Sequence, residues 1–149
     1  GARLEFSLRD GSVVTLGERA RFAVADFDEG PGHENIALRL LAGAFKAVSG
    51  ELAARNPDAM TVATTTATIG IRGTDFLGGE LTVGMPPGQP HYGFQIREGA
   101  IQVITPQGSV TLDEPGEGTF LPLAGGRPPT PVRQWTPEEA AEAEAAVAF

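Results

Sequence analysis

The chain has 149 residues, the usual length of one globular domain, and 41% of them are hydrophobic, which excludes a disordered chain. Its 19 acidic and 11 basic residues give a formal net charge of −8, which argues against nucleic acid or an anionic membrane surface as the main partner. The absence of cysteine excludes thiol catalysis, iron–sulfur ligation and Cys-based zinc sites.

An alternation of apolar and polar residues, typical of β-strands, dominates the chain up to residue 123. Leu4, Phe6 and Leu8 alternate with polar residues, and Asp10-Gly11 then predicts a hairpin turn. Further strands are expected at residues 12–16, 20–27, 36–41, 44–48, 60–71, 79–83, 92–96, 100–105, 109–112 and 119–123.

Two pairs of segments also resemble each other: 41–48 with 97–104, and 11–16 with 108–112. Repeated strand–turn units of this kind favour stacking edge to edge. We therefore expect an all-β fold, either a twisted β-sandwich or a short solenoid-like array of hairpins, with one C-terminal α-helix.

The last part of the chain has a different composition. Residues 124–134 are rich in Gly and Pro and are predicted to link a β domain at residues 1–123 to a C-terminal helix at residues 135–149. Thr136 is the expected N-cap, Pro137 the first helical residue, and Glu139 the second member of a capping box. No apolar run approaches the roughly 20 residues that span a membrane, so we expect no membrane span.

The most specific motif is a predicted bend after the Thr-rich strand, formed by Gly70, Arg72, Gly73, Thr74, Asp75 and Phe76. Gly70 and Gly73 bracket Arg72, which favours a bulge or turn at this point. Arg72 and Asp75 are expected to form a charge-assisted pair across the bend, and Phe76 to return to the core. The motif is interpreted as a structural corner, with a partner-binding surface as the alternative.

This motif carries a resemblance to a known family. Residues 68–76 are similar to the signature of FecR-domain proteins, an apolar-Gly-apolar-Arg-Gly-Thr-polar-Phe run after a Thr-rich strand. Residues 8–16 look like the Leu-x-Asp-Gly-Ser segment of that family, and residues 98–103 with 108–112 look like its closing hairpins. The resemblance covers roughly residues 3–123, in the family's order.

The resemblance implies an all-β periplasmic domain that, in the best-known members, is the outward-facing half of an anti-sigma regulator. The sequence departs from those members, because it contains no membrane helix, cytoplasmic anti-sigma segment or second signalling subdomain. We therefore expect a non-catalytic interaction or signalling module, periplasmic or secreted to the cell envelope, that binds a protein or an envelope polymer. Alternatives are a small-ligand or metal-binding β-barrel of cupin type and a structural module of a larger cell-surface protein.

No catalytic, cofactor or metal-ligating residue is predicted. The two histidines, His33 and His91, lie far apart in sequence, and His91 is interpreted as an exposed turn residue after Pro90. The acidic loop at 26–34 lacks the spacing of an EF-hand and is interpreted as a solvated loop. Trp135 and Tyr92 are expected to have packing roles.

The first strand is the remaining expectation. The chain begins already in strand alternation, like a processed form, and the family pattern would supply a strand or two before Arg3. The edge at residues 3–9 is therefore expected to be open, and open edges are templates for strand addition. We expect a weak homodimer through residues 3–9.

Overall fold

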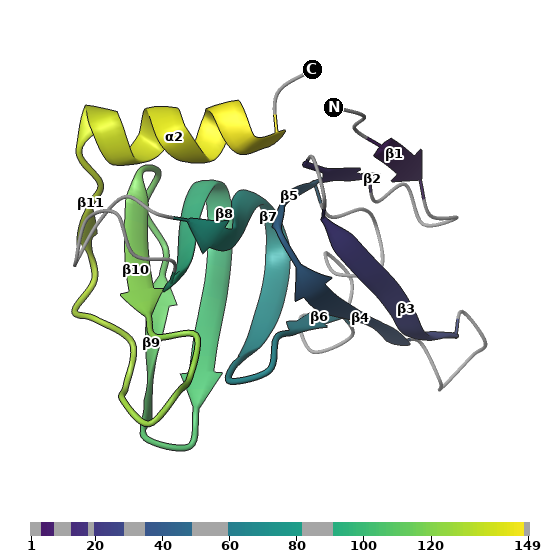
Figure 1. Ribbon diagram of the computed structural model, residues 1–149, viewed down its shortest axis with the longest axis horizontal. Helices are drawn as coiled ribbons and strands as arrows, with labels where there is room; N and C mark the ends of the chain where they lie inside the picture. Colours follow the sequence, from purple (N-terminus) through teal and green to yellow (C-terminus); the bar gives the residue numbers. More distant parts are fainter. Residues whose placement is uncertain are drawn as a thin grey trace.

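The computed structural model describes residues 4–7, 13–17, 20–28, 35–48, 60–81 and 91–147. Figure 1 shows their strands as a strongly curled sheet, with the helix lying across the top. The elements are β1 (Leu4–Ser7), β2 (Val13–Leu16), β3 (Arg21–Asp28), β4 (Asn35–Ala42), β5 (Ala44–Val48), β6 (Met60–Ala63), β7 (Thr68–Leu81), β8 (His91–Thr105), β9 (Gly108–Leu112), β10 (Glu117–Leu121), β11 (Arg133–Gln134) and α2 (Pro137–Val147). The predicted all-β class with one C-terminal helix is confirmed.

The two longest strands, β7 and β8, organise the sheet, because they pair with each other along their whole lengths. The first part of β7, residues 68–71, also pairs with β6, whereas residues 75–79 pair with β5. In the same way β8 pairs with β10 through residues 92–95 and with β9 through residues 101–105. Each long strand therefore takes part in two regions of one sheet, and it has different neighbouring strands in each region.

We call these parts the upper and the lower half-sheet. The upper half-sheet runs β1-β2-β5-β7-β8-β10-β11, and the lower half-sheet runs β3-β4-β6-β7-β8-β9. The described strands pair in antiparallel fashion except β4 with β6, which are parallel.

The main core fills the space between the inner faces of the two half-sheets. Its side chains come from both half-sheets. Phe45 and Phe76 belong to the upper half-sheet, and their rings pack edge to face with their centroids 5.4 Å apart. Ile69, Ile71 and Val103 of the lower half-sheet are fully buried in the same cluster. The two-residue alternation read from the sequence is thus the alternation between core and outer face.

A second, smaller apolar cluster lies on the outer face of the upper half-sheet. This outer cluster consists of Ala44, Leu77, Leu81, Phe120, Trp135 and Ala143. Helix α2 packs on β5 and β7 and supplies Ala143. Leu77 belongs to the outer cluster whereas its neighbour Phe76 belongs to the main core, as the alternation of β7 requires.

Two segments differ from the sequence expectations in detail. His91, interpreted as an exposed turn residue, is only 4% exposed, because β8 begins at this residue and Phe120 packs edge to face on its ring at 5.0 Å. That interpretation is wrong. Residues 124–134, predicted as a linker, contain β11, and Thr130 accepts a hydrogen bond from the Phe120 amide at 3.0 Å.

Gly78 and Gly70 offer a direct test of the core packing. A Cβ at Gly78 would lie 2.2 Å from Phe94 Cδ1 and 2.6 Å from the Gly93 carbonyl oxygen, whereas a Cβ at Gly70 would meet nothing within 4 Å. We expect Gly78→Ala to lower the free energy of unfolding by about 2–3 kcal/mol through overpacking. Gly70→Ala in the same strand should leave the free energy of unfolding unchanged or raise it by about 0.5 kcal/mol. Urea denaturation of both variants measures the difference, and equal stabilities would contradict the packing.

The edge at β1 gives a second prediction. Among the described residues β1 pairs with β2 alone, in the register Leu4↔Leu16 to Ser7↔Val13, so its other side is open. We expect weak, concentration-dependent dimerisation through residues 3–9 in sedimentation velocity, because an open edge accepts a further strand. Glu5→Pro removes a ladder donor and should abolish the dimer if that donor faces the open side. Phe6→Pro tests the opposite case, because the amides of adjacent strand residues point to opposite sides. A monomer at every concentration would contradict the prediction.

Candidate functional site

The motif singled out from the sequence forms a bulged bend in the central ladder. The pairing of β7 with β8 shifts register between Arg72 and Asp75 and again between Asp75 and Phe76. The Thr74 hydroxyl donates a hydrogen bond to the Glu98 carbonyl oxygen across the ladder, and Thr74 itself is 4% exposed. Opposite the bulge, Gly99 adopts φ 84°, a left-handed conformation that favours glycine. The bend is therefore built from both strands.

The predicted motif residues are distributed between the inside and the outside of the bend. Phe76 is fully buried in the main core, as expected, and Gly70 lies on the outer side with open space above it. Asp75 is half-buried, and its Oδ1 is buried without a hydrogen-bond partner among the described residues. The Arg72 side chain lies outside the described residues, so its pairing with Asp75 stays a prediction.

The outer face of the lower half-sheet carries small and polar side chains. The strand registers align two rows across it, Arg39–Ala63–Thr68–Ile104–Ser109 and Ala37–Thr61–Gly70–Gln102–Thr111. Ile104 is the large apolar side chain of these rows and is 40% exposed. Among the described residues no helix packs on this face, and its residues in the two rows are exposed or half-buried.

A shallow groove of about 600 Å³ continues this face at the rim of the sheet. It lies between the turn at 64–67, the hairpin end at 104–107 and residues 124–126. The hydroxyl of Thr65 is 3.0 Å from Tyr92 Oη, whereas Thr66 Oγ1 is buried and has no hydrogen-bond partner among the residues that the structure describes. The described residues of its lining include no ionisable side chain, and their hydroxyl and amide groups can form hydrogen bonds.

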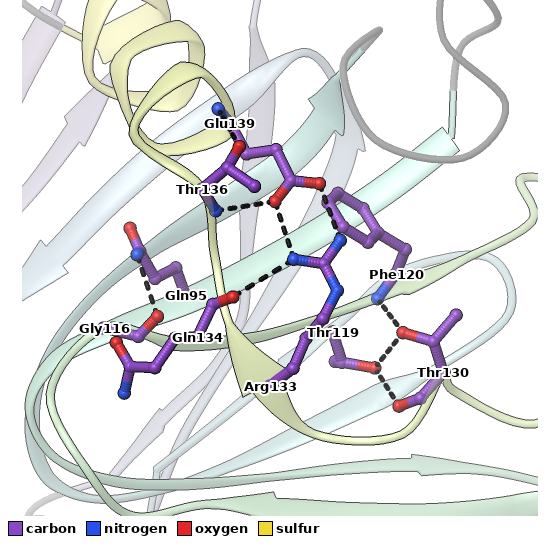
Figure 2. A network of polar contacts seen from close by, with 9 residues as sticks. All are labelled: Gln95, Gly116, Thr119, Phe120, Thr130, Arg133, Gln134, Thr136 and Glu139. Carbon is purple, nitrogen blue, oxygen red and sulfur yellow. Dashed lines mark hydrogen bonds and ion pairs between the residues drawn. The ribbon is translucent and has the colours of Figure 1, made fainter.

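The corner between β11 and α2 is held by a bidentate ion pair, shown in Figure 2. The two terminal nitrogens of Arg133 each lie 2.7 Å from a carboxylate oxygen of Glu139. Glu139 also accepts a hydrogen bond from the Thr136 amide at 2.8 Å, and the Glu139 amide donates to Thr136 Oγ1 at 3.2 Å. The predicted capping box is therefore present, with Arg133 as an additional partner that the sequence did not indicate.

Trp135 anchors this corner on the sheet. Its indole stacks on the Phe120 ring at 4.8 Å with an interplanar angle of 5°, and only 7% of the residue is exposed. The indole also lies directly over Gly118, where a Cβ would come within 2.0 Å of Trp135 Nε1. The Arg133 guanidinium carbon lies 5.7 Å from the centroid of the Phe120 ring, a cation–π distance.

The two residues of this ion pair have pKa values that are shifted in opposite directions, downward for Glu139 and upward for Arg133. The hydrogen bond from Arg133 is the main reason that the pKa of Glu139 is lowered; the bonds from Thr136 act in the same direction and burial acts against them. The pKa of Arg133 is raised by its hydrogen bond to Glu139. Both residues therefore stay ionised at neutral pH, which suits a structural link.

The described residues bring together no constellation for catalysis. They contain no group of three or more His, Asp or Glu side chains that could hold a metal ion. No helix among them is both long and apolar enough to cross a membrane. The described residues offer a sheet face that no described helix covers, a hydroxyl-lined groove and an apolar cluster under α2.

Comparison with known proteins agrees with this fold. The family model described as FecR protein matches residues 1–111 of the 149, so the chain belongs to the FecR family. A crystal structure of a candidate anti-sigma factor from Parabacteroides distasonis is similar with a TM-score of 0.70 and 14% identity. A second crystal structure of a candidate anti-sigma factor from that organism is similar with a TM-score of 0.67 and 15% identity.

Each alignment covers 95% of this chain and 59% of the chain in the crystal structure. This chain therefore spans less than two thirds of the length of the chains in those two structures. At these identities the likeness shows the fold. No curated protein sequence matches the chain.

The ion pair predicts a pH dependence that one variant isolates. Glu139 stabilises the fold fully above the ordinary pKa of glutamate, about 4.3, and this contribution is lost as the pH falls through the lower pKa of the folded state. We expect Glu139→Gln to lower the free energy of unfolding at pH 7 by about 1 kcal/mol, since Arg133 is half-exposed.

The matched control is Glu138→Gln, which removes the same charge one residue earlier in an exposed position. Thermal unfolding at pH 7 and pH 3 should show a larger Glu139→Gln deficit at pH 7 than at pH 3, with Glu138→Gln close to wild type at both values. A deficit of the same size at both pH values would mean that the carboxylate charge of Glu139 does not contribute.

Proposed function

We propose that this chain is a non-catalytic binding module of an envelope signalling protein, located in the periplasm or at the cell surface, and that it acts by contact with another protein. The observation that carries the proposal is the FecR family match over residues 1–111, together with the fold shared with the two candidate anti-sigma factors. Regulators of that class act by binding, and the family match therefore favours a binding role over a catalytic one.

The surface of the described residues supports this role. The outer face of the lower half-sheet presents nine side chains and Gly70 in two rows. No described helix covers these rows, and Ile104 adds exposed apolar area near the rim of the sheet. Exposed apolar side chains with polar neighbours occur at protein–protein interfaces. The net charge of −8 disfavours nucleic acid as a partner.

The proposal is tested by site-specific photo-crosslinking in cells that make the full-length protein. A photoreactive residue is placed at Arg39, Thr68 or Ile104, all exposed on the lower half-sheet, or at Phe76 in the main core as a control. We expect a discrete crosslinked protein in the envelope fraction from the exposed positions and none from position 76.

Crosslinks confined to the cytoplasmic fraction, or none from any exposed position, would contradict the proposal. A thermal-shift series with Ca²⁺, Zn²⁺ and Mn²⁺ checks the cupin-like alternative, because a ligand that binds the native state raises the melting temperature. We expect no shift with any of these ions.

A further inference from the structure

The edge of β9 that faces away from β8 has unused backbone hydrogen-bonding groups. Among the described strands β9 pairs with β8 alone, and this ladder has no register shift. Two residues separate Thr105 from Gly108, and in such a hairpin the two flanking residues form a hydrogen-bonded pair. Because the bonding alternates along an antiparallel ladder, the N–H and C=O groups of Ser109 and Thr111 point away from β8.

The described part of the chain leaves these outward groups unpaired. No backbone hydrogen bond from another described segment reaches Ser109 or Thr111. Pro128 approaches β9 from a different side, since its Cβ would lie 3.3 Å from a Cβ on Gly108. The alternation of β9 directs position 108 to the inner face, together with Leu112 of the main core. The C-terminal segment therefore passes under the inner face of β9 at this point.

The strand lacks the features that usually protect an open edge. Its five residues, Gly-Ser-Val-Thr-Leu, include neither a charge nor a proline, and its ladder is regular. At the opposite edge of the lower half-sheet, β3 has two register shifts and contains Arg21, Asp26 and Asp28. In the upper half-sheet, β1 contains Glu5 and β11 has two residues. Of the described edges, β9 is the best suited to accept a further strand.

The side chains beside this edge indicate what an added strand carries. The row Thr68–Ile104–Ser109 ends at Ser109, which is small, and Ile104 beside it is 40% exposed. A large apolar residue opposite Ser109 can extend over it and cover Ile104. Two exposed acids, Asp113 and Glu114, follow the other end of β9, so a basic residue fits there.

A second copy of the chain matches this edge less well than another protein does. Symmetric pairing of two β9 strands would join the lower half-sheets in one layer, so that their outer faces could not cover each other. The contact would involve the five residues of β9 from each copy, against roughly 20–30 residues on each side of a stable complex. It would also place Thr111 opposite Ser109, and a threonine is too short to cover Ile104.

We propose that β9 is the docking strand of this module, and that an extended segment of the partner protein adds to it as an antiparallel strand. Antiparallel pairs are slightly more stable than parallel ones. The segment has a large apolar residue opposite Ser109 and a basic residue four positions earlier, next to Asp113. This inference rests on the proposed function, because it assigns the binding of a partner protein to one edge of the sheet.

Two peptides that differ in the position of N-methyl groups test the backbone bonds. Both are fluorescein-labelled Lys-Thr-Val-Thr-Leu-Thr, which places Leu opposite Ser109, Val opposite Thr111 and Lys opposite Asp113. Methylation of the three threonine amides blocks the far edge of the first peptide, whereas methylation of Val and Leu removes the donors that face β9 from the second. We expect fluorescence anisotropy to show about tenfold tighter binding of the first peptide to the full chain.

Variants of the protein locate the contact. Ser109→Pro removes an outward donor and should lower the affinity for the first peptide about tenfold, whereas Ser109→Ala should change it less than about twofold. Ser109→Pro should keep a melting temperature close to that of wild type, because this amide is not bonded to β8. Val110→Pro removes a ladder donor and should lower the melting temperature clearly.

A charge reversal tests the acidic end of β9 without changing the backbone. Asp113→Lys should weaken binding of the first peptide about threefold, because its lysine then meets a like charge. The matched control is Glu138→Lys, which makes the same charge change in an exposed position on α2 and should leave the affinity unchanged.

Four results would overturn the proposal. Equal binding of the two peptides would show that no backbone bonds form. Equal losses from Ser109→Pro and Ser109→Ala would mean that the side chain is recognised. A Ser109→Pro protein as unstable as Val110→Pro would place the Ser109 amide inside the ladder. A wild-type dimer in sedimentation that Ser109→Pro abolishes would make a second copy the occupant. Crosslinks from the exposed positions of the lower half-sheet, together with equal binding of the two peptides, would leave the proposed function standing without this inference.

Discussion

The whole structure depends on the pairing of β7 with β8 through a bend. Twelve residue pairs join the two strands, and the ladder shifts register at residues 72–76. Without the bend, β5 and β6 would lie in one flat layer along the same flank of β7, and their apolar faces would have no opposing surface. With it, the two half-sheets face each other and enclose Phe45, Phe76 and Ile71.

This constraint explains why the family signature has its composition. A bulge favours small or turn-forming residues, and the Thr74 hydroxyl satisfies the Glu98 carbonyl within the distorted ladder. Phe76 immediately resumes the inward alternation. The described contacts of Thr74 and Phe76 therefore point into the protein, and the choice between a structural corner and a partner-binding surface stays a prediction. Outside the bend the two half-sheets differ, since α2 covers the upper one and no described helix covers the lower.

The sequence predicted what local patterns encode. Period-two alternation located most strands, and the Thr136–Glu139 capping box located the start of α2. Contacts between distant segments were not predictable in this way. β11 has two residues and therefore no periodicity, and its Arg133 bonds a glutamate six residues later across a corner.

His91 shows the same limit at a strand end. The prolines before it indicated a loop, and the burial of its ring depends on Phe120, 29 positions away. The parallel pairing of β4 with β6 likewise leaves no mark in the sequence of either strand, because a β-strand looks alike in both pairing directions when one face is buried.

The strand order also determines when the fold can assemble. Among the described strands, β2 and β5 pair with the rest of the sheet only through β7, and β3 and β4 only through β6 and then β7. During synthesis from the amino terminus, the β1–β2 and β3–β4 hairpins can form locally, but neither has a common strand to join until residue 81 has emerged. β7 in turn is completed by β8, which ends at residue 105. The contact order is therefore high, and the chain is expected to fold slowly and largely after most of it has been made.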